Sequence, residues 1–301
     1  ASKKNIAFCG YHGWHDWYLS ANIKSNNLSS HLLNGLNVDG VPKALKNTIF
    51  PFKYNDFKSL QEIIKKKDIG IIKMEVVRNE MPKNNFLKKV RDIATKNNII
   101  LIFDECTTGF RQTYGGIHKM FKINPDMVIL GKALGNGYAI TAVLGKNKIM
   151  KNIKNTFISS TFWTERIGSV AALKTLEEME KTRSWIKITK IGNEIRKNWK
   201  RIAKKNNLEI IISGIPALSS FMFKSKKNNH YKTFITQEML KKGYLASNVI
   251  YTSVAHNKKI LKKYYKELDT IFKKIKEFEE GLNINDYLKI KESTKSFSRL
   301  N

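Results

Sequence analysis

The sequence predicts an α/β fold, in which a mainly parallel sheet covered by helices forms a large domain and a smaller C-terminal α/β domain follows. Several short runs are continuously apolar and rich in Ile, Leu, Val and Phe, and residues 99–103 are the clearest case. Strands buried on both faces of a parallel sheet have this composition. The runs alternate along the chain with segments of helical periodicity, which favours helices layered on the sheet.

The strands predicted in the first two-thirds of the chain cover residues 5–9, 70–77, 98–104, 126–130, 141–144 and 156–159. Residues 57–67 and 84–96 are predicted to form helices between them. In the second helix, Phe86, Val90 and Ile93 have the spacing i, i+4, i+7, which places them on one apolar face. We therefore expect this helix to cover the sheet.

A long helical stretch over residues 165–205 separates these elements from a second set. That set contains strands at 208–213, 218–224 and 249–253, with helices at 233–242 and 258–278. The sequence therefore predicts a large domain over residues 1–164, a connecting helical region over 165–205 and a small C-terminal domain over 206–301.

Length and charge exclude some classes of protein. A chain of 301 residues with 42% hydrophobic residues is neither a disordered tail nor a disulfide-stabilised mini-protein. Its formal net charge of +30 makes a nucleic-acid-binding protein an alternative function. The basic residues are 47 lysines and 8 arginines, spread along the chain, whereas specific base and phosphate contacts favour arginine. We expect a compositional bias and no specific nucleic acid partner.

The location of the protein follows from three features. No run of about 18 apolar residues is present, so we expect no membrane partner. The first residues lack the apolar segment of a signal peptide. Two cysteines, Cys9 and Cys106, are too few for a disulfide framework. We predict a cytoplasmic protein.

Charged residues follow two of the predicted strands directly. The run 99–103 ends in Asp104 and Glu105, and the run 126–130 is followed by Gly131 and Lys132. Ligands of open parallel sheets bind at the carboxyl ends of strands. A lysine that forms a Schiff base and a carboxylate that holds a pyridinium nitrogen are what pyridoxal 5′-phosphate (PLP) chemistry requires.

The acidic pair has a second interpretation. Four hydrophobic residues followed by Asp104 and Glu105 also resemble the Mg²⁺-binding strand of a P-loop ATPase. The chain contains no G-x-x-x-x-G-K-S/T motif, so this alternative requires a phosphate loop upstream of residue 1. From the acidic pair alone both interpretations stay open.

Several motifs together resemble the class III aminotransferase family of PLP fold type I, and most of all its glutamate-1-semialdehyde 2,1-aminomutase branch. The motifs occur in family order over nearly the whole chain. They are Tyr-His-Gly-Trp at 11–14, Phe-Asp-Glu at 103–105 with Thr-Gly-Phe-Arg at 108–111, Pro-Asp to Gly-Asn-Gly at 125–137, Ser-Thr-Phe-Trp at 160–163, Ala-His at 255–256 and Phe-Ser-Arg-Leu at 297–300.

The resemblance implies a function and assigns roles to residues around the cofactor. It implies PLP-dependent amino-group transfer, by an aminotransferase or an aminomutase. Lys132 would be the catalytic Schiff-base lysine, which also moves the proton between substrate and cofactor. Asp104 would bind the pyridine nitrogen, Tyr11 would stack on the ring face, and His12 would orient the cofactor or simply pack beside it.

Three further positions match family positions. Cys106 would pack on the opposite face of the ring, where the family usually has a small aliphatic residue. Thr161 would reach the cofactor phosphate of the neighbouring subunit, which implies a homodimer with shared active sites. Glu75 would lie on the substrate side, and its usual proline successor is Val76 here. The substrates implied are a small-molecule amino donor and a carbonyl acceptor, and no metal is implied.

One family feature is missing from the sequence. Relatives have a Ser-Gly-Ser/Thr-Glu-Ala stretch upstream of the Tyr-His-Gly motif, and there a helix N-terminus binds the cofactor phosphate. This chain has only ten residues before Tyr11 and no such stretch. We therefore expect it to be a fragment of a longer protein.

Overall fold

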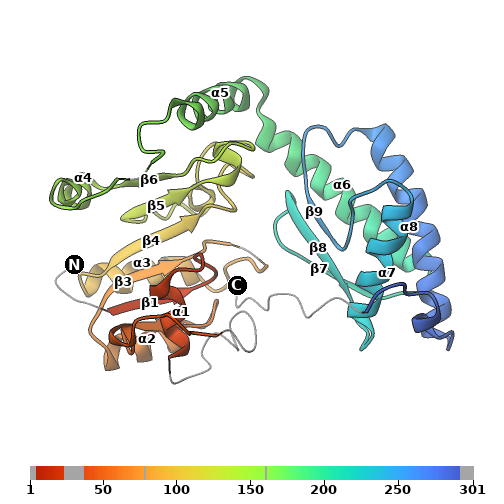
Figure 1. Cartoon of the computed structure of the whole chain (residues 1–301), viewed down its shortest axis with the longest axis horizontal. Helices are drawn as coiled ribbons and strands as arrows, with labels where there is room; N and C mark the ends of the chain where they lie inside the picture. The colour runs from red at the N-terminus through yellow and green to blue at the C-terminus, as the bar shows by residue number, and fades with distance from the viewer. Residues whose placement is uncertain (1–4, 24–36, 78, 160, 292–301) are drawn as a thin grey trace. The chain divides into compact units, whose positions relative to one another are not determined.

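The computed structural model describes residues 5–23, 37–77, 79–159 and 161–291. The chain divides into two compact units, and the division falls between Arg183 and Ser184. Each unit is built on its own sheet (Figure 1).

The first unit carries the larger sheet. Its strands are β1 (Asn5–Cys9), β2 (Ile49–Pro51), β3 (Ile69–Met74), β4 (Ile100–Glu105), β5 (Met127–Leu130) and β6 (Ala142–Gly145). Its helices are α1 (Asp16–Leu19), α2 (Phe57–Lys66), α3 (Phe86–Lys96), α4 (Asn147–Met150) and α5 (Arg166–Thr182), with short 3₁₀ segments that include η4 (Ile117–Phe121) and η5 (Lys132–Leu134).

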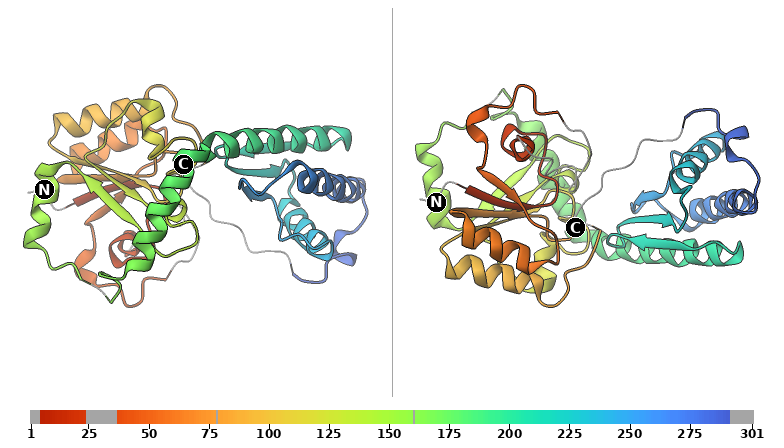
Figure 2. Two further views of the ribbon diagram at one scale, coloured as in Figure 1. Left: turned by 90° about the horizontal axis from the view of Figure 1, so that it is seen from above. Right: turned by 90° about the horizontal axis from the view of Figure 1, so that it is seen from below.

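The six strands are arranged in the order β2-β1-β3-β4-β5-β6. All neighbours are parallel except β5 and β6, which are antiparallel. Helices α2 and α3 lie on one face of the sheet and α1 lies on the other (Figure 2). The prediction of a mainly parallel sheet between helices is confirmed, and it places the ends of β1, β3, β4 and β5 at one edge.

One predicted strand is absent, and one observed strand was not predicted. Residues 156–159 form no strand, because Phe157 is 96% exposed and the segment is irregular. Strand β2 was not predicted. It has three residues and ends at Pro51, a residue that belongs at sheet edges because it cannot donate a hydrogen bond.

In its described residues, the second unit contains a three-stranded antiparallel sheet, three α-helices and the short 3₁₀ segment η7 (Ile284–Asp286). Its elements are α6 (Ser184–Lys205), β7 (Ile210–Ser213), β8 (Leu218–Phe223), α7 (Asn228–Lys241), β9 (Val249–Tyr251) and α8 (Lys258–Glu279). The core gathers alternate residues of β8, Phe221 and Phe223, with Trp199 of α6 and Phe272 of α8. Trp199 Nε1 donates to the Tyr264 hydroxyl at 2.9 Å, which satisfies its buried polar group.

The helical stretch predicted over residues 165–205 is two helices. Arg183, between α5 and α6, has a φ of 49°. This left-handed conformation ends α5, because it cannot continue a right-handed helix.

Among the described residues, no helix is long and apolar enough to cross a membrane.

Candidate active site

The ends of β4 and β5 place Asp104 and Lys132 at the same edge of the sheet. The two strands are parallel neighbours, and Glu105 is in register with Leu130. Lys132 follows Leu130 by two residues, at the start of η5. The carboxyl ends of neighbouring parallel strands are where the sheet is open to a ligand.

Asp104 is held by three groups. His12 Nδ1 lies 3.0 Å from Asp104 Oδ2, and Lys73 Nζ lies 3.5 Å from the same oxygen. The amide of Cys106 donates to Oδ1 at 3.3 Å. His12 Nε2 lies 3.2 Å from the carbonyl oxygen of Cys9. Both ring nitrogens of His12 thus have an oxygen within hydrogen-bond distance.

These contacts determine the charge of Asp104. Burial raises the pKa of the Asp104 carboxyl, but the hydrogen bond and charge of His12, the charge of Lys73 and the Cys106 amide outweigh it, so the pKa lies below its ordinary value. Asp104 is therefore a buried carboxylate that stays ionised, as a partner for a cationic ring nitrogen must be.

Lys132 is presented by an unusual backbone. Its φ is 44°, in the left-handed region that residues other than glycine rarely adopt. Its Nζ donates to Thr107 Oγ1 at 2.7 Å. A Cβ on the preceding Gly131 would lie 2.8 Å from Cys106 Sγ and 3.1 Å from Thr141 Cγ2, so only glycine fits there without a shift. Local strain of this kind is concentrated at functional sites.

The pKa of the Cys106 thiol is affected by several charged groups of the site. Burial raises the pKa of the Cys106 thiol, and the carboxylates of Asp104 and Glu75 raise it further. The charges of Lys132 and Lys73 act in the opposite direction. The charges of two amines and two carboxylates therefore act on one half-buried side chain.

Glu75 fixes the loop that carries Tyr11. It follows β3, is 3% exposed, and its Oε2 accepts the amide N–H of Tyr11 at 3.0 Å. The amide of Glu75 in turn donates to the carbonyl of Cys9 at 3.1 Å. Burial and the charge of Glu75 raise the pKa of the Cys9 thiol well above its ordinary value, so that thiol stays protonated.

An aromatic cluster lies behind these groups. The centres of the Tyr11 ring and the half-exposed Trp14 ring are 5.1 Å apart. The His12 ring stacks on the Trp17 ring, with 6.1 Å between the ring centres. Tyr18 donates its hydroxyl to the carbonyl of Gly10 at 3.1 Å. These contacts anchor the loop after β1, with Tyr11 and His12 at its start.

Glu105 points away from the site. Successive residues of a strand face opposite sides of the sheet, and Glu105 is fully buried on the side opposite to Asp104. Its carboxylate accepts the amides of Ile117 and His118 and contacts the His118 ring, which fixes the start of η4. Because this carboxylate is already bound by backbone amides and by His118, it does not fit the Mg²⁺-binding role of the ATPase alternative.

The predicted site residues thus form one cluster and one outlier. Tyr11, His12, Glu75, Asp104, Cys106 and Lys132 come from the ends of β1, β3, β4 and β5. Thr161 is exposed in the segment before α5. The Ala-His match at 255–256 lies in the second unit, and the match at 297–300 lies outside the described residues.

Lys73 is the site residue that sequence reasoning missed. It lies in β3, and its side chain is 15% exposed. The available signal was a charged residue in the middle of the apolar run 69–74, where lysine is rare unless it has a partner.

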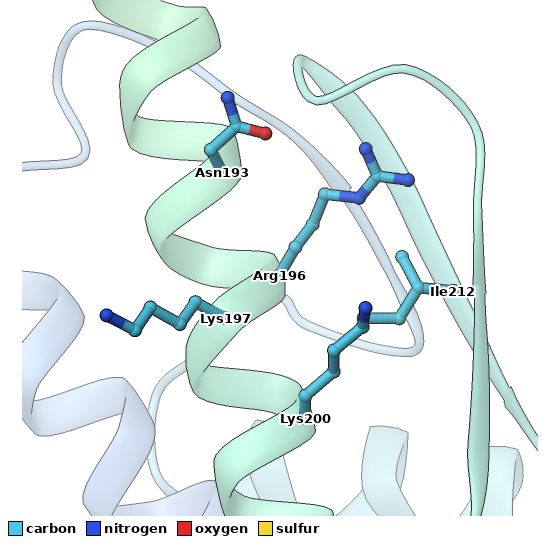
Figure 3. Close-up of a pocket in the computed structure, with 5 residues that line it drawn as sticks. All are labelled: Asn193, Arg196, Lys197, Lys200 and Ile212. Atoms are coloured by element: carbon cyan, nitrogen blue, oxygen red, sulfur yellow. The ribbon is translucent and has the colours of Figure 1, made fainter.

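A hollow of about 520 Å³ in the second unit does not share this chemistry. It is lined by Asn193, Arg196, Lys197, Lys200 and Ile212 (Figure 3). Arg196 and Lys200 extend toward the strand that carries Ile212, whereas Lys197 points the other way (Figure 3). These side chains bring no carboxylate and no aromatic ring together. Within the described ranges, no group of three or more His, Cys, Asp or Glu side chains could hold a metal ion.

Comparison with known proteins decides the family. Residues 2–274 match the family described as aminotransferase class-III. The chain belongs to the class III aminotransferase family. The resemblance inferred from the motifs is thereby confirmed, and neither the nucleic-acid-binding alternative nor the ATPase alternative gains support.

Two class III relatives illustrate the similarity. The chain is 34% identical over 244 residues to a 3-aminobutyryl-CoA aminotransferase of Cloacimonas acidaminovorans, covering 78% of this chain and 55% of the relative. It is 33% identical over 289 residues to a glutamate-1-semialdehyde 2,1-aminomutase of Nitrosopumilus maritimus, covering 87% of this chain and 66% of the relative. The chain thus spans between half and two-thirds of the length of these relatives.

Solved structures show the same fold. The FumI protein of Sphingopyxis sp. MTA144, in a PLP internal aldimine form, superposes with a TM-score of 0.81 at 21% identity, over 95% of this chain and 68% of that one. An omega-transaminase from Sphaerobacter thermophilus superposes with a TM-score of 0.75 at 17% identity, over 93% and 69%. The predicted fold class, PLP fold type I, is confirmed.

Proposed function

We propose that this chain forms the PLP-binding part of an enzyme that transfers an amino group between small molecules. The observation that carries the proposal is the pairing of an ionised, buried Asp104 with Lys132 at the adjacent ends of β4 and β5. Membership of the class III family supports the same chemistry.

The side chains present fit this cofactor. PLP has a ring nitrogen that binds a carboxylate, an aldehyde that reacts with an amine and two flat faces. Asp104 offers a carboxylate oxygen, Lys132 offers the amine, and Tyr11, in the loop held by Glu75, would offer an aromatic face. Cys106 adds a small, half-buried side chain for the opposite face.

Each of these residues would then have a defined role. When bound, PLP supplies an electron sink for the bonds at the substrate carbon. Asp104 holds a proton on the ring nitrogen, and His12 keeps Asp104 in position. Lys132 would supply the amine that holds the cofactor, and it would hold and move a proton at its Nζ. Glu75 positions the Tyr11 loop at the substrate side.

Further parts of the proposal concern the whole protein. The first unit would be the large PLP-binding domain and the second the small domain, with boundaries that the sequence places at 164 and 205. Thr161 would reach the cofactor phosphate of a second copy, so the enzyme would be a homodimer with shared sites. Its exposure is compatible with a contact to a second copy of the chain. The cytoplasm remains the predicted location, and the free thiols of Cys9 and Cys106 suit a reducing compartment.

The substrates would be an amino donor and a carbonyl acceptor. The two most similar activities among the relatives named above are an aminotransferase and an aminomutase. Supplying a single amino-aldehyde substrate, with and without a separate acceptor, distinguishes them. An aminomutase turns over without the acceptor, whereas an aminotransferase stops after one half-reaction.

The test is a PLP titration of purified protein that contains residues 1–301, followed by visible absorbance. Lys132→Ala should abolish the absorbance band of covalently held cofactor, and Asp104→Asn should weaken binding by at least about tenfold because a charged hydrogen bond is lost. Lys148→Ala, which removes an exposed lysine, is the matched control. If Lys132→Ala and Lys148→Ala titrate like the unaltered protein, the proposed function is wrong.

A further inference from the structure

Lys73 is a charged residue in the interior of the larger sheet. Strand β3 is paired on both sides, and Lys73 is in register with Phe8 of β1 and Ile102 of β4. Its side chain is 15% exposed. A buried ammonium group is costly unless an opposite charge compensates it. The position of this lysine therefore calls for a partner.

Two contacts compensate the charge. Lys73 Nζ is 3.5 Å from Asp104 Oδ2, and it is 5.0 Å from the centre of the Trp17 ring, within the range of a cation–π contact. The ammonium group thus contacts both the aromatic ring and the carboxylate. Lys73 thus has one defined place, beside the carboxylate that the proposed function assigns to the cofactor nitrogen.

The two oxygens of Asp104 are used unequally. Oδ2 is shared by His12 Nδ1 and Lys73 Nζ, whereas Oδ1 accepts the amide of Cys106 at 3.3 Å. A carboxylate oxygen can accept more than one hydrogen bond. Oδ1 can therefore take a second donor without displacing either cation from Oδ2.

We propose that Lys73 is a positioning residue for Asp104: together with His12 it fixes one carboxylate oxygen, keeps the carboxylate negatively charged and leaves the other oxygen for a cationic ring nitrogen. The statement about the ring nitrogen rests on the proposed function; the statement about Asp104 does not.

The charged and titratable groups around Asp104 come from four elements. His12 comes from the loop after β1, Lys73 from β3 with Glu75 directly after it, and Lys132 from η5, while Cys106 directly follows β4, the strand that carries Asp104. Among these, His12 and Lys73 act on Asp104 with opposite charge, and both lower the pKa of the Asp104 carboxyl. Removing either should raise that pKa.

The first experiment measures the titration of the Asp104 carboxyl without any cofactor. Carboxyl ¹³C resonances are followed by NMR between pH 2 and pH 7, at about 0.1 M salt, and Asp104→Asn assigns the signal. In Lys73→Met the Asp104 midpoint should move upward by about one pH unit, the lower end of the effect of an opposite charge at this range. Lys73→Arg should leave it near the unaltered value. Lys66→Met, which removes an exposed lysine of α2, controls for net charge.

A midpoint that Lys73→Met leaves unchanged overturns the proposal, and so does an equal move in Lys66→Met. If Lys73→Met does not fold, the unaltered protein provides the test. The Lys73 Nζ resonance should then show an inflection at the Asp104 midpoint, because the ammonium group senses the loss of its partner's charge. A Lys73 resonance with no inflection there overturns the proposal equally.

The second experiment uses PLP labelled with ¹⁵N at the ring nitrogen. Without Lys73, Asp104 is more basic and should hold the proton on the ring nitrogen to a higher pH. The ring-nitrogen midpoint should therefore move upward in Lys73→Met and stay in place in Lys73→Arg. If PLP binds both forms and this midpoint does not move, the role toward the ligand is wrong. If PLP binds neither, the proposed function fails while the Asp104 titration still stands.

Discussion

Replacing Asp126 should destabilise the first unit in a graded way. Asp126 directly precedes β5, the strand whose end carries Lys132, and it is 9% exposed. Its Oδ2 accepts the amide of Leu101 and the Arg91 guanidinium, both at 2.8 Å, and its Oδ1 accepts Lys146 Nζ at 2.7 Å. One carboxylate thus connects β4, α3 and the residue after β6 to the start of β5.

The three contacts contribute unequally to the free energy of unfolding. The buried Leu101 amide would lose its acceptor in Asp126→Ala, which costs about 1.5 kcal/mol. The Arg91 pair is partly buried and adds about 1 to 1.5 kcal/mol, whereas Lys146 is 59% exposed and its screened pair adds at most about 0.5 kcal/mol. Asp126→Ala should therefore cost about 3 kcal/mol, Asp126→Asn about half of that, and Lys146→Met about 0.5 kcal/mol or less.

The assay is urea unfolding followed by circular dichroism, at pH 7 and again at lower pH. Burial raises the pKa of Asp126, but the Leu101 amide, Lys146 and Arg91 outweigh it, so the pKa lies below its ordinary value. A depressed carboxyl pKa stabilises the fold above the unfolded value of about 3.9 and loses this effect as the pH falls through the folded value. The difference between the unaltered protein and Asp126→Asn should thus shrink below about pH 4. Equal losses for Asp126→Ala and Lys146→Met, or a difference that grows on acidification, would refute this reasoning.

Two further substitutions test how the ends of β4 and β5 are packed. Gly131→Ala should lower the free energy of unfolding by about 1 to 3 kcal/mol, because the new methyl group overpacks against Cys106 Sγ. Adding Cys106→Ala should restore much of this loss. A double mutant no more stable than Gly131→Ala would show that this contact is not the cause. Glu105→Gln should cost about 2 kcal/mol in urea unfolding, because one amide oxygen and an NH₂ group replace two acceptors that serve Ile117 and His118; amide hydrogen exchange in η4 should rise in this variant, and an unchanged exchange rate there would count against the role of Glu105.

Much of the sheet could be predicted because several of its strands are short apolar runs between helical segments. The runs at β1, β4 and β5 are continuously apolar, and their ends were located within one or two residues. The prediction of a strand at 156–159 was wrong because a strand needs a neighbouring strand to pair with, and apolar composition alone does not indicate one. The break at Arg183 escaped prediction because the left-handed conformation of a single arginine leaves no compositional signal.

The site was predictable in its parts and less so in its connections. Asp104 and Lys132 could be paired because both follow apolar runs that end at one edge of a parallel sheet. The sequence could not tell that His12 contacts Asp104, 92 positions away, or that Glu75 binds the amide of Tyr11. Such contacts depend on strand order, which places β1 and β4 on either side of β3. Lys73 was overlooked for the same reason, since its partner lies on the neighbouring strand.

Lys132 is the residue that we propose to hold the cofactor covalently. Protein containing residues 1–301 is incubated with PLP, reduced with borohydride, digested and mapped by mass spectrometry. We predict that the reduced cofactor is found on the peptide containing Lys132, at near-stoichiometric yield, and that it is lost in Lys132→Ala. Cofactor found mainly on Lys73, or scattered over the many surface lysines with no preference for Lys132, would show that Lys132 does not have this role.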